Sequence, residues 1–158
     1  MELTRDAKFA AIEAELGYSF GGEIKIGGNY VSVVRHGSEV YVSGQVPRVG
    51  DTVVVTGRVG ADVSLAQAQL AAKVCAMRAL ALLRQSLGSL DAISQVLRIT
   101  AFVQSAQDFT LQSEVADGAS AVLYAVLGEA GVHTRTSVGV YQLPKNAAVE
   151  IDLIAVAA

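Results

Sequence analysis

Residues 64–87, SLAQAQLAAKVCAMRALALLRQSL, and residues 93–104, ISQVLRITAFVQ, decide the fold of this chain. Ser64 and Gln67 form a capping-box pattern and Gly88 is a typical C-terminal stop, so the first stretch predicts a helix. It is apolar around most of its circumference, as expected for a helix lying on a sheet. The second stretch alternates and predicts a strand, with one face formed by Leu97, Ile99, Ala101 and Val103.

Working outward, the flanking patterns predict further elements. A helix at residues 4–16 precedes a glycine-rich passage, and residues 30–34 and 40–43 form a β-hairpin around His36-Gly37-Ser38. The β-branched run 53–56 predicts an edge strand. After residue 104 we expect a helix over about 109–127, and strands 135–142 and 149–156 paired as a closing hairpin.

This order of elements predicts an α+β fold in which two long helices cover one face of a mixed sheet. The other face then has to meet water or another subunit. We divide the chain into an N-terminal helical extension, residues 1–28, and one domain, residues 29–158.

Composition limits the classes of function. The 158 residues are 52% hydrophobic and 17% charged with a net charge of −3, yet the longest charge-free stretch, 118–128, is too short to span a membrane. The N-terminus has no basic region followed by an apolar run, which predicts a cytoplasmic protein. One cysteine and two histidines predict no metal cluster, and the absence of clustered Lys and Arg predicts no nucleic-acid partner.

Candidate chemistry lies in the last two predicted strands. No nucleophile elbow or phosphate-binding loop is present, so no cofactor is expected. The closing hairpin places Arg135 and Ser137 on one face and Glu150 and Asp152 opposite them if paired residue numbers sum to about 287. A guanidinium can grip a carboxylate and a nearby carboxylate can activate water, although a solvated cross-strand ion pair has the same pattern.

Two further residues can titrate. His133 lies just before a predicted strand and is either a catalytic group or a structural loop histidine. Cys75 lies in the middle of an apolar helix, which favours a small core residue over a reactive thiol.

Three motifs in order, VSGQVP (42–47), TRTSVGV (134–140) and LPKNAAVEID (143–152), resemble the RidA (YjgF) family of enamine/imine deaminases. The resemblance covers about residues 30–156. It implies a chorismate-mutase-like fold of the Bacillus type and a homotrimer with a central barrel of sheets and clefts between subunits. It also implies hydrolysis of reactive enamines and imines, such as 2-aminoacrylate and 2-iminopropanoate, to the keto acid and ammonia without metal or organic cofactor.

Position by position, the resemblance makes Arg135 the carboxylate-binding residue and Glu150 the residue that positions water. Tyr30, Ser43 and Gly44 match pocket-lining positions. Ser137 stands where many members have cysteine, and Thr136 replaces the usual serine. Candidates for an asparagine that the family places in the preceding helix are Ser113 and Asp117.

We therefore expect hydrolytic deamination of a small imino or enamine acid. The alternative is a trimer that binds a small carboxylate or other metabolite in the same cleft without turnover. A third hypothesis is ribonuclease activity or translation inhibition. It fits poorly with a net charge of −3 per chain, because contacts of basic residues with the phosphate backbone dominate nucleic-acid affinity.

Overall fold

A computed structural model describes residues 2–158 as three α-helices, seven β-strands and three short 3₁₀ turns. Along the chain these elements are α1 (Arg5–Leu16), β1 (Val33–His36), β2 (Glu39–Gln45), β3 (Arg48–Val49), β4 (Thr52–Val53), α2 (Leu65–Leu87), η1 (Leu90–Ala92), β5 (Ile93–Gln104), α3 (Gln112–Leu127), η2 (Gly128–Gly131), β6 (Thr134–Val140), η3 (Pro144–Asn146) and β7 (Val149–Ala157).

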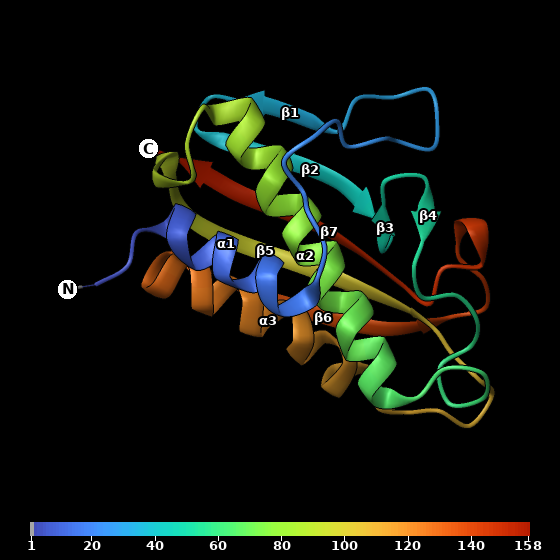
Figure 1. Ribbon diagram of the computed structural model, residues 1–158. Helices are drawn as coiled ribbons and strands as arrows, with labels where there is room; N and C mark the ends of the chain where they lie inside the picture. Colours follow the sequence, from blue (N-terminus) through green and yellow to red (C-terminus); the bar gives the residue numbers. More distant parts are fainter. Residues whose placement is uncertain (1) are drawn as a thin grey trace.

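Five strands form one sheet in the order β1-β2-β7-β5-β6 (Figure 1). The β5 and β6 strands are parallel and the other neighbours are antiparallel, which confirms the mixed sheet. The first hairpin is confirmed as β1 and β2. Helices α2 and α3 pack on the same face of the sheet, where Val40, Ile99 and Leu153 are buried. The α+β class is therefore confirmed.

The predicted closing hairpin is wrong, because β6 and β7 are not neighbours. Strand β5 lies between them, parallel to β6 and antiparallel to β7. The connection from β5 to β6 passes through α3, and a helical crossover of this kind makes adjacent strands parallel. The connection after β6 then passes β5, and β7 inserts between β5 and β2.

The structure also differs from three smaller predictions. The run 53–56 is not an edge strand of the main sheet, because β4 pairs only with β3 in a separate two-stranded ribbon. A register shift between Val96 and Arg98 turns Val96 inward and leaves Leu97, expected inside, 37% exposed. The third helix begins at Gln112 rather than near residue 109.

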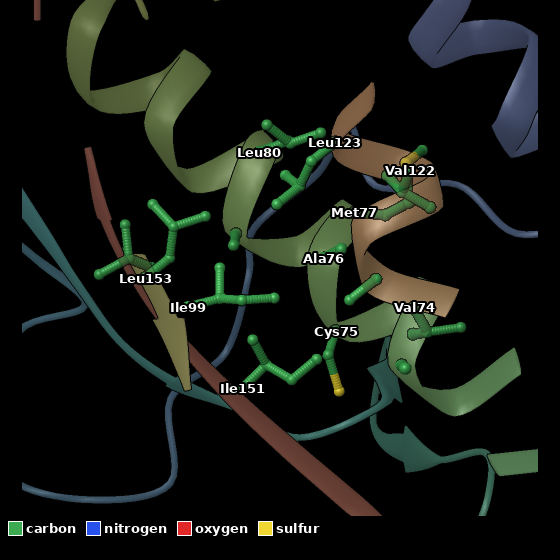
Figure 2. Packing of buried hydrophobic residues seen from close by; sticks show 14 of the residues in the cluster. Val74, Cys75, Ala76, Met77, Leu80, Ile99, Val122, Leu123, Ile151 and Leu153 are labelled. Atoms are coloured by element: carbon green, nitrogen blue, oxygen red, sulfur yellow. The ribbon is translucent and has the colours of Figure 1, made fainter. Parts of the chain in front are cut away.

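The local signals around α2 are confirmed. The Ser64 hydroxyl accepts a hydrogen bond from the Gln67 amide, the reciprocal bond of the capping box is present, and Gly88 ends the helix in the left-handed conformation. Cys75 is fully buried, as expected for a core residue. Figure 2 shows side chains of α2, α3, β5 and β7 meeting in one apolar layer.

Helix α1 is attached to the same layer. Phe9 is fully buried, and Arg5 Nη1 donates to the carbonyls of Leu90 and Ile93, both at 2.8 Å. In the described part of the chain, residues 2–158, no helix has the length and apolar character needed to cross a membrane.

The face of the sheet turned away from the helices is uncovered in the single chain. It carries apolar side chains that remain partly exposed, with Val34 at 52%, Tyr41 at 42% and Val138 at 40%. We call this surface the open face. Exposed apolar side chains gathered on one face are typical of surfaces that contact another molecule.

Candidate functional site

The first of two polar clusters surrounds Arg135 on the edge strand β6. Arg135 lies beside the buried Ile99, so its side chain is on the helix-covered face and reaches α3. Its Nη1 donates to Asp117 Oδ1 and to Ser120 Oγ, both at 2.9 Å. Its Nη2 donates to the Ser113 carbonyl at 3.1 Å and to Ser113 Oγ at 2.8 Å. These four bonds fix the guanidinium, and the side chain stays 20% exposed.

His133 belongs to the same cluster through Ser120. The distance from His133 Nδ1 to the Gly131 carbonyl oxygen is 2.6 Å, so Nδ1 carries the proton in this contact. In the neutral ring, Nε2 then accepts from the Ser120 hydroxyl at 2.9 Å. The Tyr124 ring stacks on the imidazole with centroids 5.4 Å apart. His133 therefore orients Ser120, which in turn holds Arg135.

The second cluster is a cleft of about 190 Å³ that contains Glu150 on β7. Tyr30 and Gly44, both predicted site residues, line it together with Pro144 and Lys145 from the loop before β7. Ser43 precedes Gly44 but is not one of the lining residues; Gln45 Nε2 donates to its carbonyl at 3.0 Å. Of the residues predicted to line the pocket, Tyr30 and Gly44 thus lie in the cleft with Glu150, whereas Ser43, Thr136 and Ser137 are not among its lining residues.

Gly44 allows the close approach of Glu150 to strand β2. A Cβ atom at position 44 would overlap the Glu150 carboxylate, so a larger residue would displace it. The register between β2 and β7 also shifts between Val42 and Gln45, and such irregularities redirect side chains. Gly44 therefore sets where the carboxylate lies in the cleft.

The environment of Glu150 favours its neutral form. Partial burial raises the pKa of the Glu150 carboxyl above its ordinary value, and the charge of Asp152 raises it further. None of the ion pairs among residues 2–158 includes Glu150. A carboxylate with a raised pKa is a stronger base than an ordinary glutamate, which suits it to take a proton from water and return it.

The structure does not bring Arg135 and Glu150 together within one chain. Glu150 lies opposite Phe102 and Asp152 opposite Thr100, whereas Arg135 lies beside Ile99. Successive side chains of a strand point to opposite faces of the sheet, and paired residues share a face. Glu150 and Asp152 are therefore on the open face, and Arg135 is on the helix-covered face. The expected pairings of Ser137 with Glu150 and of Arg135 with Asp152 are therefore wrong, because β5 separates the two strands.

Ser137 and Thr136 also lie on opposite faces of the sheet. Ser137 shares the helix-covered face with Arg135, and its hydroxyl is buried with no hydrogen-bond partner among residues 2–158. Thr136 is on the open face, where Arg98 Nη2 donates to its hydroxyl. Of these two residues, Thr136 is therefore the one that shares a face with Glu150.

Several polar residues of these clusters were not predicted as site residues. Ser120 could have been found, since Ser113, Asp117 and Ser120 follow the i, i+4, i+7 spacing of one helix face. Arg78 is only 4% exposed, and its guanidinium donates to Gln45 Oε1 at 3.1 Å and to the carbonyls of Arg48 at 2.7 Å and Lys25 at 2.8 Å. The sequence signal for Arg78 is its position as the one charged residue in the apolar stretch 74–83 of α2.

Gln104 was also missed, and it fixes the loop beside the cleft. This residue is 1% exposed. Its Nε2 donates to Asn146 Oδ1 at 2.7 Å and to the Gly57 carbonyl at 3.1 Å, and its Oε1 accepts from the Leu143 amide at 2.7 Å. The loop that carries Lys145 is therefore tied to the end of β5.

Neither the cysteine nor the carboxylates form a metal centre in the described residues. Among residues 2–158, no three His, Cys, Asp or Glu side chains gather in a way that could hold a metal ion. Burial raises the pKa of the Cys75 thiol, which disfavours the reactive thiolate. The charged groups at the centre of the two clusters are the Arg135 guanidinium and the Glu150 carboxyl group.

Comparison with known proteins gives consistent matches over nearly the whole chain. A family model described as "YjgF/chorismate mutase-like, putative endoribonuclease" matches residues 15–156. Protein TCP17 of Trypanosoma cruzi is 38% identical over 98% of this chain and 97% of its own length. Among solved structures, Atu1372 of Agrobacterium tumefaciens, a protein of unknown function, is 40% identical with a TM-score of 0.86, covering 97% of this chain and 94% of its own. TdcF of E. coli, solved with bound serine, is 26% identical with a TM-score of 0.62, covering 84% of this chain and 91% of its own.

Proposed function

Because the chain belongs to the YjgF/chorismate mutase-like family, we propose that it hydrolyses small 2-imino and enamine acids to the 2-keto acid and ammonia. The observation that supports this most directly is the half-buried Glu150 carboxyl, which faces a small cleft and has a raised pKa. The relative TdcF was solved with serine, a small molecule with the same α-carboxylate as these substrates. We place the activity in the cytoplasm.

Each step can be assigned to a residue. Arg135 holds the substrate carboxylate through paired hydrogen bonds, which replace its bonds to the Asp117 carboxylate and the Ser113 hydroxyl. The substrate reacts as the iminium ion, C=NH₂⁺. Glu150 takes a proton from a water molecule, whose oxygen bonds to the iminium carbon while the C=N electron pair moves to nitrogen. Glu150 then gives this proton to the nitrogen of the tetrahedral adduct. The C–N bond breaks, ammonia leaves, and the hydroxyl proton passes to the solvent as the keto group forms.

We further propose that the site is completed between subunits of a homotrimer. Arg135 and Glu150 are on opposite faces of one sheet, so a site with both takes Arg135 from one copy and Glu150 from the next. A closed ring uses such a head-to-tail contact, in which different surfaces of two copies meet. The partly exposed Val34, Tyr41 and Val138 on the open face support this assembly, because contact with another copy would cover them.

The direct test is ammonia release from freshly generated 2-iminopropanoate. We expect the wild type to accelerate release and Arg135→Ala to lower kcat/KM about 100-fold or more, because the substrate carboxylate loses its charged partner. Arg35→Ala is the matched control, since Arg35 is exposed on β1 and bonds only within its own turn, to the Gly37 carbonyl. Equal rates for wild type and Arg135→Ala, or no acceleration by either, would contradict the proposal. Carboxylate binding without turnover would favour the non-catalytic alternative.

The pH dependence of kcat/KM tests the role of Glu150. Glu150 acts as a base only when ionised, so its raised pKa moves the acid limb of the profile above the ordinary glutamate value. In Asp152→Asn, a like charge is removed, and the acid limb is expected to move to lower pH. Asp91→Asn, at an exposed position in η1, is the control and should leave the profile unchanged. An acid limb that does not move in Asp152→Asn would count against Glu150 as the titrating base.

A further inference from the structure

The cleft that contains Glu150 has an excess of positive charge. Its lining includes four basic residues, Lys25, Arg48, Arg78 and Lys145, and Glu150 as the acidic one. Like charges gathered in a partly enclosed space repel one another, and this repulsion is relieved when an anion binds between them. The cleft is thus suited to an anionic ligand.

Two of the four cations already have partners. Lys25 forms an ion pair with Asp51. The guanidinium of Arg78 is engaged with Gln45 and with the carbonyls of Arg48 and Lys25. These residues shape the wall of the cleft.

The other two cations are free to bind a ligand. Among residues 2–158, none of the ion pairs includes Arg48 or Lys145, and the Nε of Arg48 is buried without a hydrogen-bond acceptor. A buried donor without an acceptor is costly, so this nitrogen indicates a missing partner. The Glu150 carboxylate is not ion-paired with either cation.

The loop that carries Lys145 is held in an unfavourable conformation. Lys145 and Asn146 have φ values of 61° and 58°, in the left-handed region that residues with side chains avoid. The bonds from the buried Gln104 to Asn146 and Leu143 hold the loop there. Strained loops persist where the surrounding structure imposes them and are concentrated at ligand sites, which supports a binding role for Lys145.

From these observations, and resting on the proposed function, we propose that Arg48 and Lys145 bind a second carboxylate of the substrate. The preferred substrates are then imines of dicarboxylic amino acids. Arg135 of a neighbouring copy holds the carboxylate next to the C=N bond, and Arg48 and Lys145 hold the distal one. The volume of about 190 Å³ suits a small dicarboxylate rather than a large ligand.

Calorimetric binding of two stable acids tests the distal site without requiring turnover. Succinate and butyrate have the same chain length and differ in the second carboxylate. We expect the wild type to bind succinate about tenfold or more tightly than butyrate, as hydrogen bonds to charged groups would give. This preference should be lost in Arg48→Gln and reduced in Lys145→Gln, neither of which removes a hydrogen bond or ion pair seen in the fold. Arg35→Gln, which removes a cation on β1, is the matched control and should keep the preference.

Turnover of 2-iminosuccinate and 2-iminobutanoate separates the two proposals. A succinate preference that depends on Arg48 without hydrolysis of either imine would support the distal site and contradict the deaminase activity. Hydrolysis of both imines with equal kcat/KM, together with equal binding of succinate and butyrate, would support the deaminase activity and overturn the distal site. A succinate preference that persists in both Arg48→Gln and Lys145→Gln would also overturn it.

Discussion

Replacing Glu150 with glutamine is expected to lower kcat for 2-iminopropanoate hydrolysis by about 10²–10⁴-fold, the range that a positioned acid–base group contributes. Glutamine has nearly the same shape but cannot take a proton from water. The fold should be unaffected, because none of the described ion pairs includes Glu150. The measurement is steady-state ammonia release, with Glu15→Gln as the control, since Glu15 is exposed on α1, away from the sheet. A rate within a fewfold of wild type would show that Glu150 is not the base.

Trimers that contain both Glu150→Gln and Arg135→Ala chains test whether two subunits share one active site. Trimers made only of Arg135→Ala chains or only of Glu150→Gln chains are expected to be inactive. A trimer that contains both kinds of chain has one subunit interface at which an intact Arg135 meets an intact Glu150. In a closed three-subunit ring one site in three is then intact, so mixed trimers purified away from both parents should have about a third of wild-type activity. The two chains would be co-expressed with different tags and purified through both. Mixed trimers as inactive as their parents would contradict a site shared between subunits.

The helices and the strand at the centre of this fold could be predicted because their signals are local. Ser64, Gln67 and Gly88 specify the ends of α2 through hydrogen bonds within a few residues, and these bonds are present. The alternation in β5 reflects burial of one face and is correct from Ile99 onward. Where a register shift interrupts the strand near Leu97, the period of two no longer predicts which side is buried.

The pairing of the last strands could not be predicted from their neighbourhood in the sequence. Strands β6 and β7 follow each other and carry hairpin-like patterns, but each pairs with β5 instead. The position of β7 between β2 and β5 depends on contacts with residues far apart in the chain. Consequently Glu150 and Asp152 were assigned to the same face as Arg135 and lie on the opposite one. Glu150 nevertheless shares its cleft with the predicted Tyr30 and Gly44, and Arg135 shares its cluster with the predicted Ser113 and Asp117.

The polar network around the candidate site shows the same division between local and tertiary signals. The resemblance identified Ser113 and Asp117 as candidates, and both bind Arg135. Gln104 and Arg48 carry no such signal, because the hydrogen-bond partners of Gln104 lie about 40 residues away in the sequence and Arg48 faces a cleft made by distant segments. Their roles follow from tertiary structure alone.

Gly118, which interrupts the apolar pattern of α3, is expected to be required for stability, and Gly118→Ala should lower the free energy of unfolding by about 1–3 kcal/mol. A Cβ at this position would overlap the backbone carbonyl of Gln69, where α3 crosses α2, and a backbone atom cannot move aside as a side chain can. This loss would exceed the roughly 1 kcal/mol by which alanine favours a helix over glycine. Thermal unfolding at a fixed protein concentration should show a Tm lower by about 2–10 °C. Gly22→Ala is the matched control, since a Cβ there meets no atom within 4 Å, and it should leave the Tm unchanged. If Gly118→Ala instead raises the Tm, helix propensity outweighs the contact and the close packing of α2 on α3 does not depend on this glycine.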